Sequence, residues 1–365
     1  MHVPAAEVPL WLMLSVVALL AAFSPVPPWV VEQFYSLGVY PLIQTWLTTV
    51  TNLLPIAVLD GLIVSLLVVL LLWARRAWIV ARHRSVVDAV WELARRSVRL
   101  TAAVALLFFW TWGCNYRRLP LEGTLSAGQG VTPTPERLRH AVADANGLAA
   151  RLRPSVVSTS PSYDDLAVAL RAPLNRALDL LGRPPLGAPG RPKFSLLLTP
   201  YFTAAGINGM VNPLALEAIV HPDLLPFERG YVLAHEWAHL AGLADEAEAS
   251  AVGWLACMKG PPEAAYSASL YLIMEAVAAL PAGERGEALR RVDVGVRADL
   301  QAIAERRVRQ QPVVREAASR AYNEFLRANR IEDGTASYAR ALRLILASPV
   351  YDAMGDVRRD RKPPA

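Results

Sequence analysis

The chain has 365 residues, which is enough for more than one domain. It is 54% hydrophobic with a mean hydropathy of +0.28, which is high for a soluble protein and indicates membrane segments. The net charge of +5 comes with one arginine cluster in the N-terminal third, and the sequence after it shows no basic groove interleaved with aromatic residues. We therefore predict no nucleic-acid partner.

Three apolar segments predict transmembrane helices, at residues 8–23, 56–79 and 98–113. No Lys or Arg precedes the first segment, which argues against a cleaved signal peptide. The middle segment approaches the ~20 residues that a bilayer crossing needs. The third is shorter and relies on aromatic interfacial anchors, and a short buried helix is its alternative. We predict a membrane domain over residues 1–114.

Arginine placement predicts the orientation of this membrane domain. Residues 24–55 hold no Lys or Arg, whereas the loop between the second and third segments is rich in arginine. The arginines are Arg75, Arg76, Arg82, Arg84, Arg95, Arg96 and Arg99. The positive-inside rule places this loop in the cytoplasm. We thus expect a multi-pass protein of the inner or plasma membrane whose C-terminal part is extracytoplasmic, in the periplasm or outside the cell.

Residues 115–355 predict a mainly α-helical extracytoplasmic domain with a small β element, followed by a disordered tail at 356–365. The predicted helices are 135–151, 162–181, 245–258, 263–280, 284–309, 313–329 and 335–346. Residues 194–199 predict a short buried strand.

Residues 206–220 form a long segment upstream of the most informative motif. Such an edge could pair with an extended polypeptide substrate, which makes Gly206, Asn208 and Asn212 candidate substrate contacts. An ordinary connecting loop is the alternative.

The most informative motif is His235-Glu236-x-x-His239, which lies in an apolar, helix-forming run. Residues four apart share one face of a helix, so both imidazoles can bind one metal ion. Glu236 is rotated about 100° from His235 around the helix. From there it can reach a water activated by zinc rather than the ion itself. Gly242 is placed to end the helix in the left-handed conformation. A buried helix with hydrogen-bonded core histidines is the alternative.

A zinc site of this kind needs a third protein ligand, and the residues after Gly242 offer three. Asp245 would extend the motif in the way of some metzincin-type peptidases. Glu248 would bind from the first turns of a following helix, where a capping-box glutamate is the alternative. Asp245 would then cap that helix. Glu246 is expected to face solvent.

Donors to a developing oxyanion are also needed. Tyr338, Arg340 and His221 carry suitable groups. For each of them, core packing or a surface ion pair is the alternative.

Three stretches of the chain resemble the DUF3810 family, bacterial membrane proteins with a zincin-like motif. The first is the run Trp112-Gly-Cys-Asn115-Tyr116-Arg117. The second joins Pro226 and the His-Glu-x-x-His motif to Glu246-x-Glu248-Ala249. The third comprises Tyr322, Leu326, Ala328, Asn329, Asp333, Gly334, Ser337, Tyr338 and Arg340. The resemblance covers nearly the whole chain, and only the metal motif is chemically specific.

The resemblance implies a membrane-anchored zinc metallopeptidase that acts on a peptide or protein. It favours Glu248 as the third ligand, because the family repeats the Glu-x-Glu-Ala segment and is usually not acidic at the position of Asp245. One Zn²⁺ would then be held by His235, His239 and Glu248, with Glu236 as general base. Ser250 stands where the family usually has Asn.

Two other classes of function remain open from the sequence: a binding or scaffold protein, and a sensor, each with a structural or degenerate zinc site. The complete motif argues against them, because a structural site has no need of Glu236. The sequence does not indicate a specific substrate or an oligomeric state.

Overall fold

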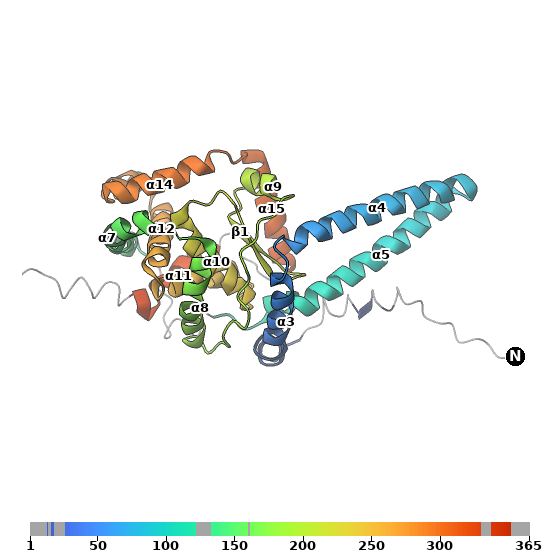
Figure 1. Ribbon diagram of the computed structural model, residues 1–365, viewed down its shortest axis with the longest axis horizontal. Helices are drawn as coiled ribbons and strands as arrows, with labels where there is room; N and C mark the ends of the chain where they lie inside the picture. Colours follow the sequence, from blue (N-terminus) through green and yellow to red (C-terminus); the bar gives the residue numbers. More distant parts are fainter. Residues whose placement is uncertain are drawn as a thin grey trace, which may run out of the picture.

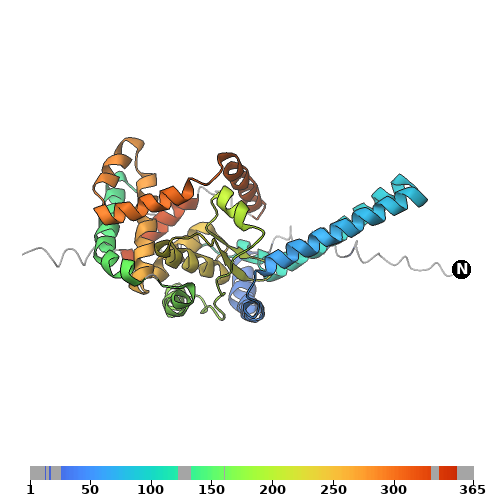
Figure 2. The same ribbon diagram turned by 45° about the horizontal axis from the view of Figure 1, so that its top comes forward.

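The computed structural model describes residues 26–121, 133–159, 161–329 and 337–351, together with Met13, Val16 and Val17; for 337–339 it describes the backbone alone. A helical body carries a long hairpin of two helices that projects from it (Figures 1 and 2). The structure is mainly helical, as predicted.

The projecting hairpin consists of α4 (Val58–His83) and α5 (Val86–Thr111), and no residue of α4 is buried. Ser85 begins α5 as its N-cap, because its hydroxyl accepts a hydrogen bond from the Asp88 amide. Near the turn, Glu92 of α5 pairs with Arg76 of α4 at 2.7 Å and with Arg96 at 2.6 Å. Arg76, Glu92 and Arg96 thus form a charged cluster between the two helices, on the side of the hairpin that is far from the body.

Helix α4 is the one helix in the described part of the chain that is long and apolar enough to cross a membrane. Its bounds overlap the predicted segment 56–79. The predicted segment 98–113 corresponds mostly to the second half of α5, whose first half is charged. The predicted segment 8–23 lies outside the described residues apart from Met13, Val16 and Val17. Three crossings therefore stay a prediction.

The body is built around α10 (Pro226–Leu240), which packs against α11 (Glu246–Met258), α12 (Pro262–Ala279) and α8 (Tyr163–Asp179). Helix α7 (Pro135–Thr159) covers α12 on its other side. The remaining body helices are α9 (Thr199–Ala205), α13 (Ala282–Arg290), α14 (Val294–Arg307), α15 (Pro312–Ala328) and α16 (Ser337–Leu346). One predicted helix, 284–309, is divided into α13 and α14 because Asp293 caps a new helix start.

The β element is an antiparallel hairpin of β1 (Gly209–Asn212) and β2 (Glu217–Val220), with Gly209 opposite Val220. It lies within the predicted edge segment 206–220. The prediction of a strand at 194–199 is wrong. Only Lys193 bridges to Ile219 there. The chain then turns, because the Ser195 hydroxyl accepts from the Leu198 amide at 2.9 Å, and α9 follows at once.

An N-terminal segment packs on the body at the base of the helical hairpin. It comprises α2 (Pro28–Val30), the π-helix η1 (Val31–Val39) and α3 (Tyr40–Asn52). Helix α3 runs across the direction of α4 and α5 in Figure 1. Tyr40 donates to the Leu240 carbonyl at 2.9 Å, and Thr48 donates to that of Leu216 at 2.7 Å. These bonds fasten α3 to the end of α10 and to the β-hairpin turn.

Glu217 fixes the start of α4 to the body. Its carboxylate accepts from the Val58 and Leu59 amides at 2.9 and 2.8 Å, which is the arrangement that a helix N-terminus favours for an anion. Lys193 pairs with the same carboxylate at 2.9 Å, and both side chains are almost completely buried. The first turn of α4 is therefore bound directly to β2. After the last residue of α5, the short 3₁₀ helix η2 (Gly113–Arg117) leads back into the body.

Candidate metal centre

Helix α10 carries both histidines of the motif, and its two ends are well defined. Pro226 occupies the first turn, where its missing N–H is not needed. The Glu228 carboxylate accepts from the Leu225 amide at 3.0 Å and pairs with Arg306 at 2.7 Å. Gly242 ends the helix with φ of 90°, as predicted, and its amide donates to the His239 carbonyl.

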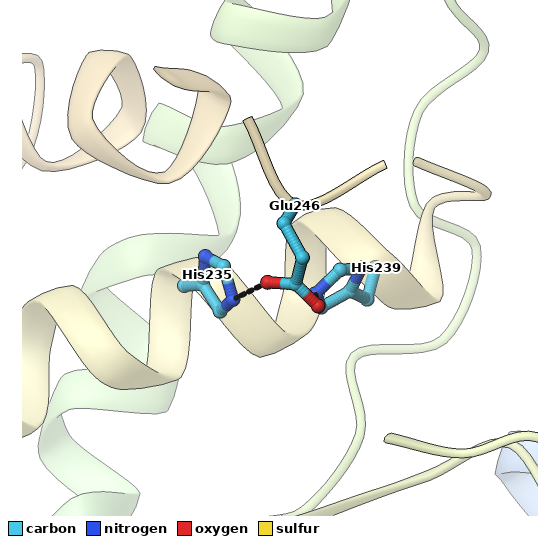
Figure 3. Close-up of side chains that lie close together, drawn as sticks. All are labelled: His235, His239 and Glu246. Atoms are coloured by element: carbon cyan, nitrogen blue, oxygen red, sulfur yellow. Dashed lines mark ion pairs between the residues drawn. The ribbon is translucent and has the colours of Figure 1, made fainter. Parts of the chain in front are cut away.

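The two histidines meet a carboxylate from the next helix. One oxygen of Glu246 lies 3.4 Å from His235 Nε2, and the other lies 3.5 Å from His239 Nε2. The potential ligand atoms of the three residues all lie within 4.8 Å of one another. Figure 3 shows the Glu246 side chain reaching from α11 toward the two rings of α10. These three residues could hold a metal ion.

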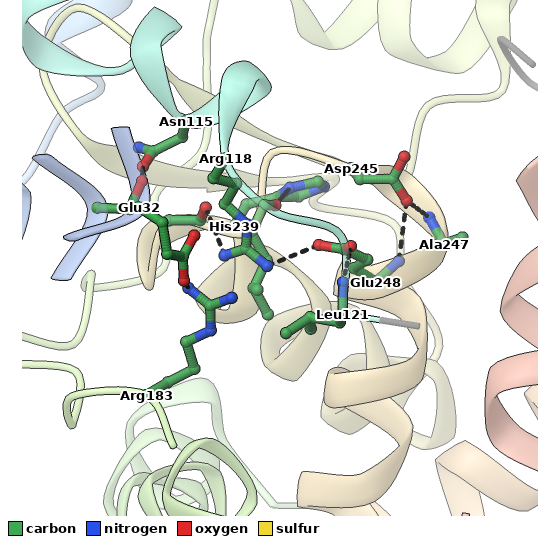
Figure 4. A network of polar contacts seen from close by, with 12 residues as sticks. Glu32, Asn115, Arg118, Leu121, Arg183, His239, Asp245, Ala247 and Glu248 are labelled. Atoms are coloured by element: carbon green, nitrogen blue, oxygen red, sulfur yellow. Dashed lines mark hydrogen bonds and ion pairs between the residues drawn. The ribbon is translucent and has the colours of Figure 1, made fainter. Parts of the chain in front are cut away.

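The third member of this group is not the one that we predicted. Glu248 faces away from the histidines: it pairs with Arg118 at 2.7 Å and accepts from the Leu121 amide at 2.7 Å (Figure 4). Asp245 is the N-cap of α11, accepting from the Ala247 and Glu248 amides at 2.9 and 3.1 Å. Glu246, which we expected to face solvent, has a side chain that is only 19% exposed.

Helix α11 can place Glu246 there because it packs on α10 at backbone distance. A Cβ atom at Gly253 would lie 2.9 Å from the His235 nitrogen and 3.0 Å from its Cα. Only glycine allows this approach. Since α11 begins immediately after its Asp245 cap, its first turn then lies over the motif face of α10.

Each histidine is held through its other ring nitrogen. His239 Nδ1 lies 2.6 Å from the Leu243 carbonyl, which can only accept, so Nδ1 carries a proton and Nε2 is the nitrogen that could bind a metal. Ser250 Oγ lies 3.4 Å from His235 Nδ1. Ser250, which stands where the family usually has Asn, thus contacts a histidine of the metal motif. The Trp112 ring packs edge-on against the His239 ring, with 6.2 Å between centroids.

Glu236 is buried between α10 and β1. Its side chain is nearly inaccessible, and burial raises its pKa to about 6, although His235 and His239 oppose the shift. Its Oε2 atom has no hydrogen-bond partner among the described residues. A Cβ atom at Gly209 would lie 2.6 Å from Glu236 Oε1, so the first residue of β1 lies directly against this carboxylate.

Electrostatics couple the three clustered residues. Burial lowers the pKa of His239, but the nearby Glu246 carboxylate outweighs it and raises the value to about 9. Burial likewise raises the pKa of Glu246, and the two imidazoles overcome it and hold the value well below its usual range. Without a cation, Glu246 thus holds a proton on His239, and a metal ion that binds the Nε2 atom would displace that proton.

A family model described as "Protein of unknown function (DUF3810)" matches residues 35–346. The chain belongs to the DUF3810 family. Comparison with curated proteins and with solved structures found no match. The match covers both the helical hairpin and the metal motif of this DUF3810 protein.

Of the predicted oxyanion donors of this DUF3810 protein, His221 and Arg340 interact with residues outside the cluster. Both ring nitrogens of His221 are engaged: Nδ1 accepts from the Asp223 amide and Nε2 lies 2.9 Å from Thr203 Oγ1. Arg340 pairs with Asp245. The Tyr338 side chain lies outside what the structure describes.

The three predicted substrate-contact residues each have a structural role in the fold. Gly206 ends α9 in the left-handed conformation, with φ of 76°. The Asn208 side chain accepts from Arg306 at 2.9 Å. Asn212 is buried, and its amide donates to Glu217 at 3.0 Å. Among the described residues no strand pairs with the outer edge of β1, since β2 lies between β1 and Lys193.

Tyr322 is the site residue that sequence reasoning missed. Its hydroxyl donates to Glu246 from α15, so an O–H group lies beside the clustered side chains. Burial raises the pKa of Tyr322 well above its usual range, which keeps this donor protonated. Tyr322 opens the third stretch of the family resemblance, and that was the available signal.

Gly253→Ala should disturb the cluster through the packing of α10 on α11. The added methyl group has to displace the His235 backbone, and overpacking of this kind typically costs about 1–3 kcal/mol. Denaturant unfolding of the protein in detergent micelles, followed by near-UV circular dichroism, measures the loss.

Gly283→Ala is the matched control, because a Cβ atom there meets nothing within 4 Å. This variant should be as stable as the unaltered protein or slightly more stable. Equal stability of the two variants would show that the helices have room at Gly253.

Proposed function

We propose that this protein is a membrane-anchored zinc metallopeptidase whose ion is held by His235, His239 and Glu246. The observation that carries the proposal is the convergence of these three side chains beside a buried carboxylate, Glu236. Two neutral imidazoles and one carboxylate are the protein ligands of a common class of catalytic zinc site.

The spacing of the donor atoms fits zinc. Two atoms that share a tetrahedral zinc ion at ~2.0–2.2 Å lie about 3.4 Å apart. Each histidine Nε2 is at about this distance from a different oxygen of Glu246, 3.4 Å for His235 and 3.5 Å for His239. The Leu243 carbonyl supports the required tautomer of His239. Glu236 Oε2, which lacks a partner in the described part of the chain, supplies the acceptor that a catalytic site needs.

When bound, zinc supplies a Lewis acid that polarises a carbonyl and acidifies water. Glu236 is the general base in this proposal: it takes a proton from the attacking water and passes it to the leaving amine. A pKa of about 6 suits both transfers near neutral pH, because the carboxylate is mostly ionised yet still basic. Its burial excludes bulk water from the transfer.

The proposed substrate is a polypeptide in extended conformation. The β1 strand has a free backbone edge, and its residue Gly209 contacts Glu236. A chain that adds to this edge by main-chain hydrogen bonds would bring a peptide carbonyl close to the general base. Backbone pairing of this kind selects extended segments rather than particular side chains.

For the membrane part, we propose that α4 and α5 cross the bilayer together as a hairpin. Between the body and the Arg76–Glu92–Arg96 cluster, residues 61–74 and 100–111 carry no charged side chain. These stretches are short for a bilayer core of ~30 Å, and arginine side chains reaching outward to the headgroups compensate. The positive-inside rule places the arginine-rich turn in the cytoplasm and the body outside.

Glu236→Gln should keep the metal and lose hydrolysis. The amide preserves shape but takes up no proton, so turnover of an unfolded protein such as casein should fall about 10²–10⁴-fold. Zinc content and peptide release are measured on the same purified sample. Glu284→Gln, at an exposed position on α13, is the control and should change neither.

Full hydrolysis by Glu236→Gln would exclude the general-base role. A wild-type protein that holds zinc firmly but cleaves no peptide would favour the scaffold or sensor function instead.

Glu246→Gln and Glu248→Gln separate the two candidate ligands. Each substitution removes one negative charge from the first turn of α11. Glu246→Gln should weaken zinc binding by more than about 100-fold, whereas Glu248→Gln should stay within about tenfold, as for a residue that only supports the site. Competition with a chromogenic chelator measures both affinities. The reverse order would restore Glu248 as the ligand.

The orientation is tested by adding protease to intact spheroplasts. The body should be cut from outside, while a tag inserted in the turn at Arg84 should be reached only after the membrane is permeabilised. Protection of the body in intact cells would reverse the proposed topology.

A further inference from the structure

One face of α3 is apolar and exposed. The residues Val39, Leu42, Trp46, Val50 and Leu53, here called the α3 apolar face, recur at helical spacing. Leu42, Trp46 and Leu53 are 72%, 65% and 78% exposed. Large apolar side chains gathered on one side of a helix usually mark an interaction surface.

The buried face of the same helix is unusually polar. Gln44 donates to the Ala188 carbonyl at 2.6 Å, and Thr48 donates to that of Leu216 at 2.7 Å. Thr51 is also buried. Helix α3 therefore buries polar side chains beside Tyr40 and Ile43, although an ordinary surface helix keeps its polar residues on the outer side. Its outer face is suited to an environment less polar than water.

The surroundings of α3 identify that environment. No charged residue occurs from Gln33 to Leu59, and α4, the apolar helix suited to crossing a bilayer, begins at Val58. Helix α3 lies at the base of the α4–α5 hairpin and runs across it (Figures 1 and 2). A helix that lies across a bilayer-crossing hairpin at its base lies along the membrane surface.

Exposed tryptophans are found at both ends of the hairpin. Trp110 is 56% exposed near the body end of α5. Trp78 and Trp91 are exposed near the turn, and Arg82 and Arg95 lie over their rings. Tryptophan favours the two interfaces of a bilayer, and Trp46 of α3 belongs to the body-side set.

We propose that the α3 apolar face is seated in the outer interface of the bilayer, at the boundary between headgroups and acyl chains. This inference rests on the membrane part of the proposed function and is independent of zinc and hydrolysis. Amphipathic helices bind this boundary through their apolar side even in proteins that have no membrane-spanning helix. In this protein the adjoining helix α4 also holds α3 at the boundary. Tyr40 of α3 donates a hydrogen bond to the Leu240 carbonyl and packs against Gly242. The C-terminal end of α10 is therefore held near the lipid surface.

Spin labels test whether the α3 apolar face lies in the bilayer interface. The full chain is reconstituted in vesicles of phosphatidylcholine and phosphatidylglycerol. Cys114 is replaced by serine, and buried Cys257 is kept. Single cysteines replace Leu42, Trp46 or Leu53, whose exposure allows labelling without disturbing the fold. Collisions of the label with oxygen, which concentrates in lipid, are compared with collisions with a water-soluble nickel chelate.

Two reference positions make the result decisive. Val168 of α8 is 82% exposed on the body and should collide with nickel, while Leu71 of α4 is 70% exposed and should collide with oxygen. Labels on the α3 apolar face should show an oxygen-to-nickel ratio several-fold above that of Val168. Adding Leu42→Glu to the Leu53 label should lower its ratio, because a carboxylate disfavours the acyl boundary.

Each contrary outcome has a distinct meaning. High nickel collisions at α3 with oxygen collisions at Leu71 would overturn the inference and leave the proposed crossing intact. Low collisions with both reagents would show that protein covers the face, either a second copy or another segment of this chain, and would also overturn it. Water exposure at Leu71 would refute the proposed crossing itself.

Discussion

The candidate site depends on the contact between the backbones of α10 and α11 at Gly253. Without a side chain there, α11 approaches so closely that its first turn reaches the face of α10 that carries His235 and His239. Protein interiors are close-packed, so even one extra methyl group at such a point has to be absorbed by movement of a helix. The metal cluster is thus a consequence of interhelical distance as much as of the motif.

The sequence predicts that the two histidines lie close together, because their relation is local to one helix. It does not predict which carboxylate joins them, because that depends on how α11 is rotated about its axis. Arg118 and the Leu121 amide, which are 130 and 127 residues from Glu248, draw this side chain to the far side. Glu246 is then left facing α10. Contacts over such separations leave no periodic signal in the chain.

Other differences from the sequence-based expectations are local and also have physical causes. Residues 194–199 are apolar enough for a strand, but the Ser195 hydroxyl stabilises a turn, and the segment enters α9. Asp293 interrupts a helical pattern by capping a new helix. Predictions of helix content were right because an amphipathic pattern suffices, while boundaries depend on single capping residues.

The candidate metal cluster and the α4–α5 hairpin share their supporting contacts. Trp112, which follows α5, packs on His239, and Arg118 holds Glu248 and the Gly242 carbonyl. Contacts therefore cross the predicted domain boundary at residue 114, and residues 115–355 taken alone would lose Trp112 and Tyr40 from the end of α10.

A second line of contacts runs from α4 to the general base. Glu217 binds the first amides of α4 and the Asn212 side chain at the end of β1. Gly209, at the other end of β1, contacts Glu236. The strand proposed to receive the substrate is thus joined to the proposed bilayer-crossing helix through hydrogen bonds to one buried carboxylate, Glu217. Its burial is tolerated because Lys193 pairs with it and both of its oxygens are hydrogen-bonded. Fixing β1 in this way limits its freedom before a substrate arrives, which lowers the entropy cost of pairing along its free edge.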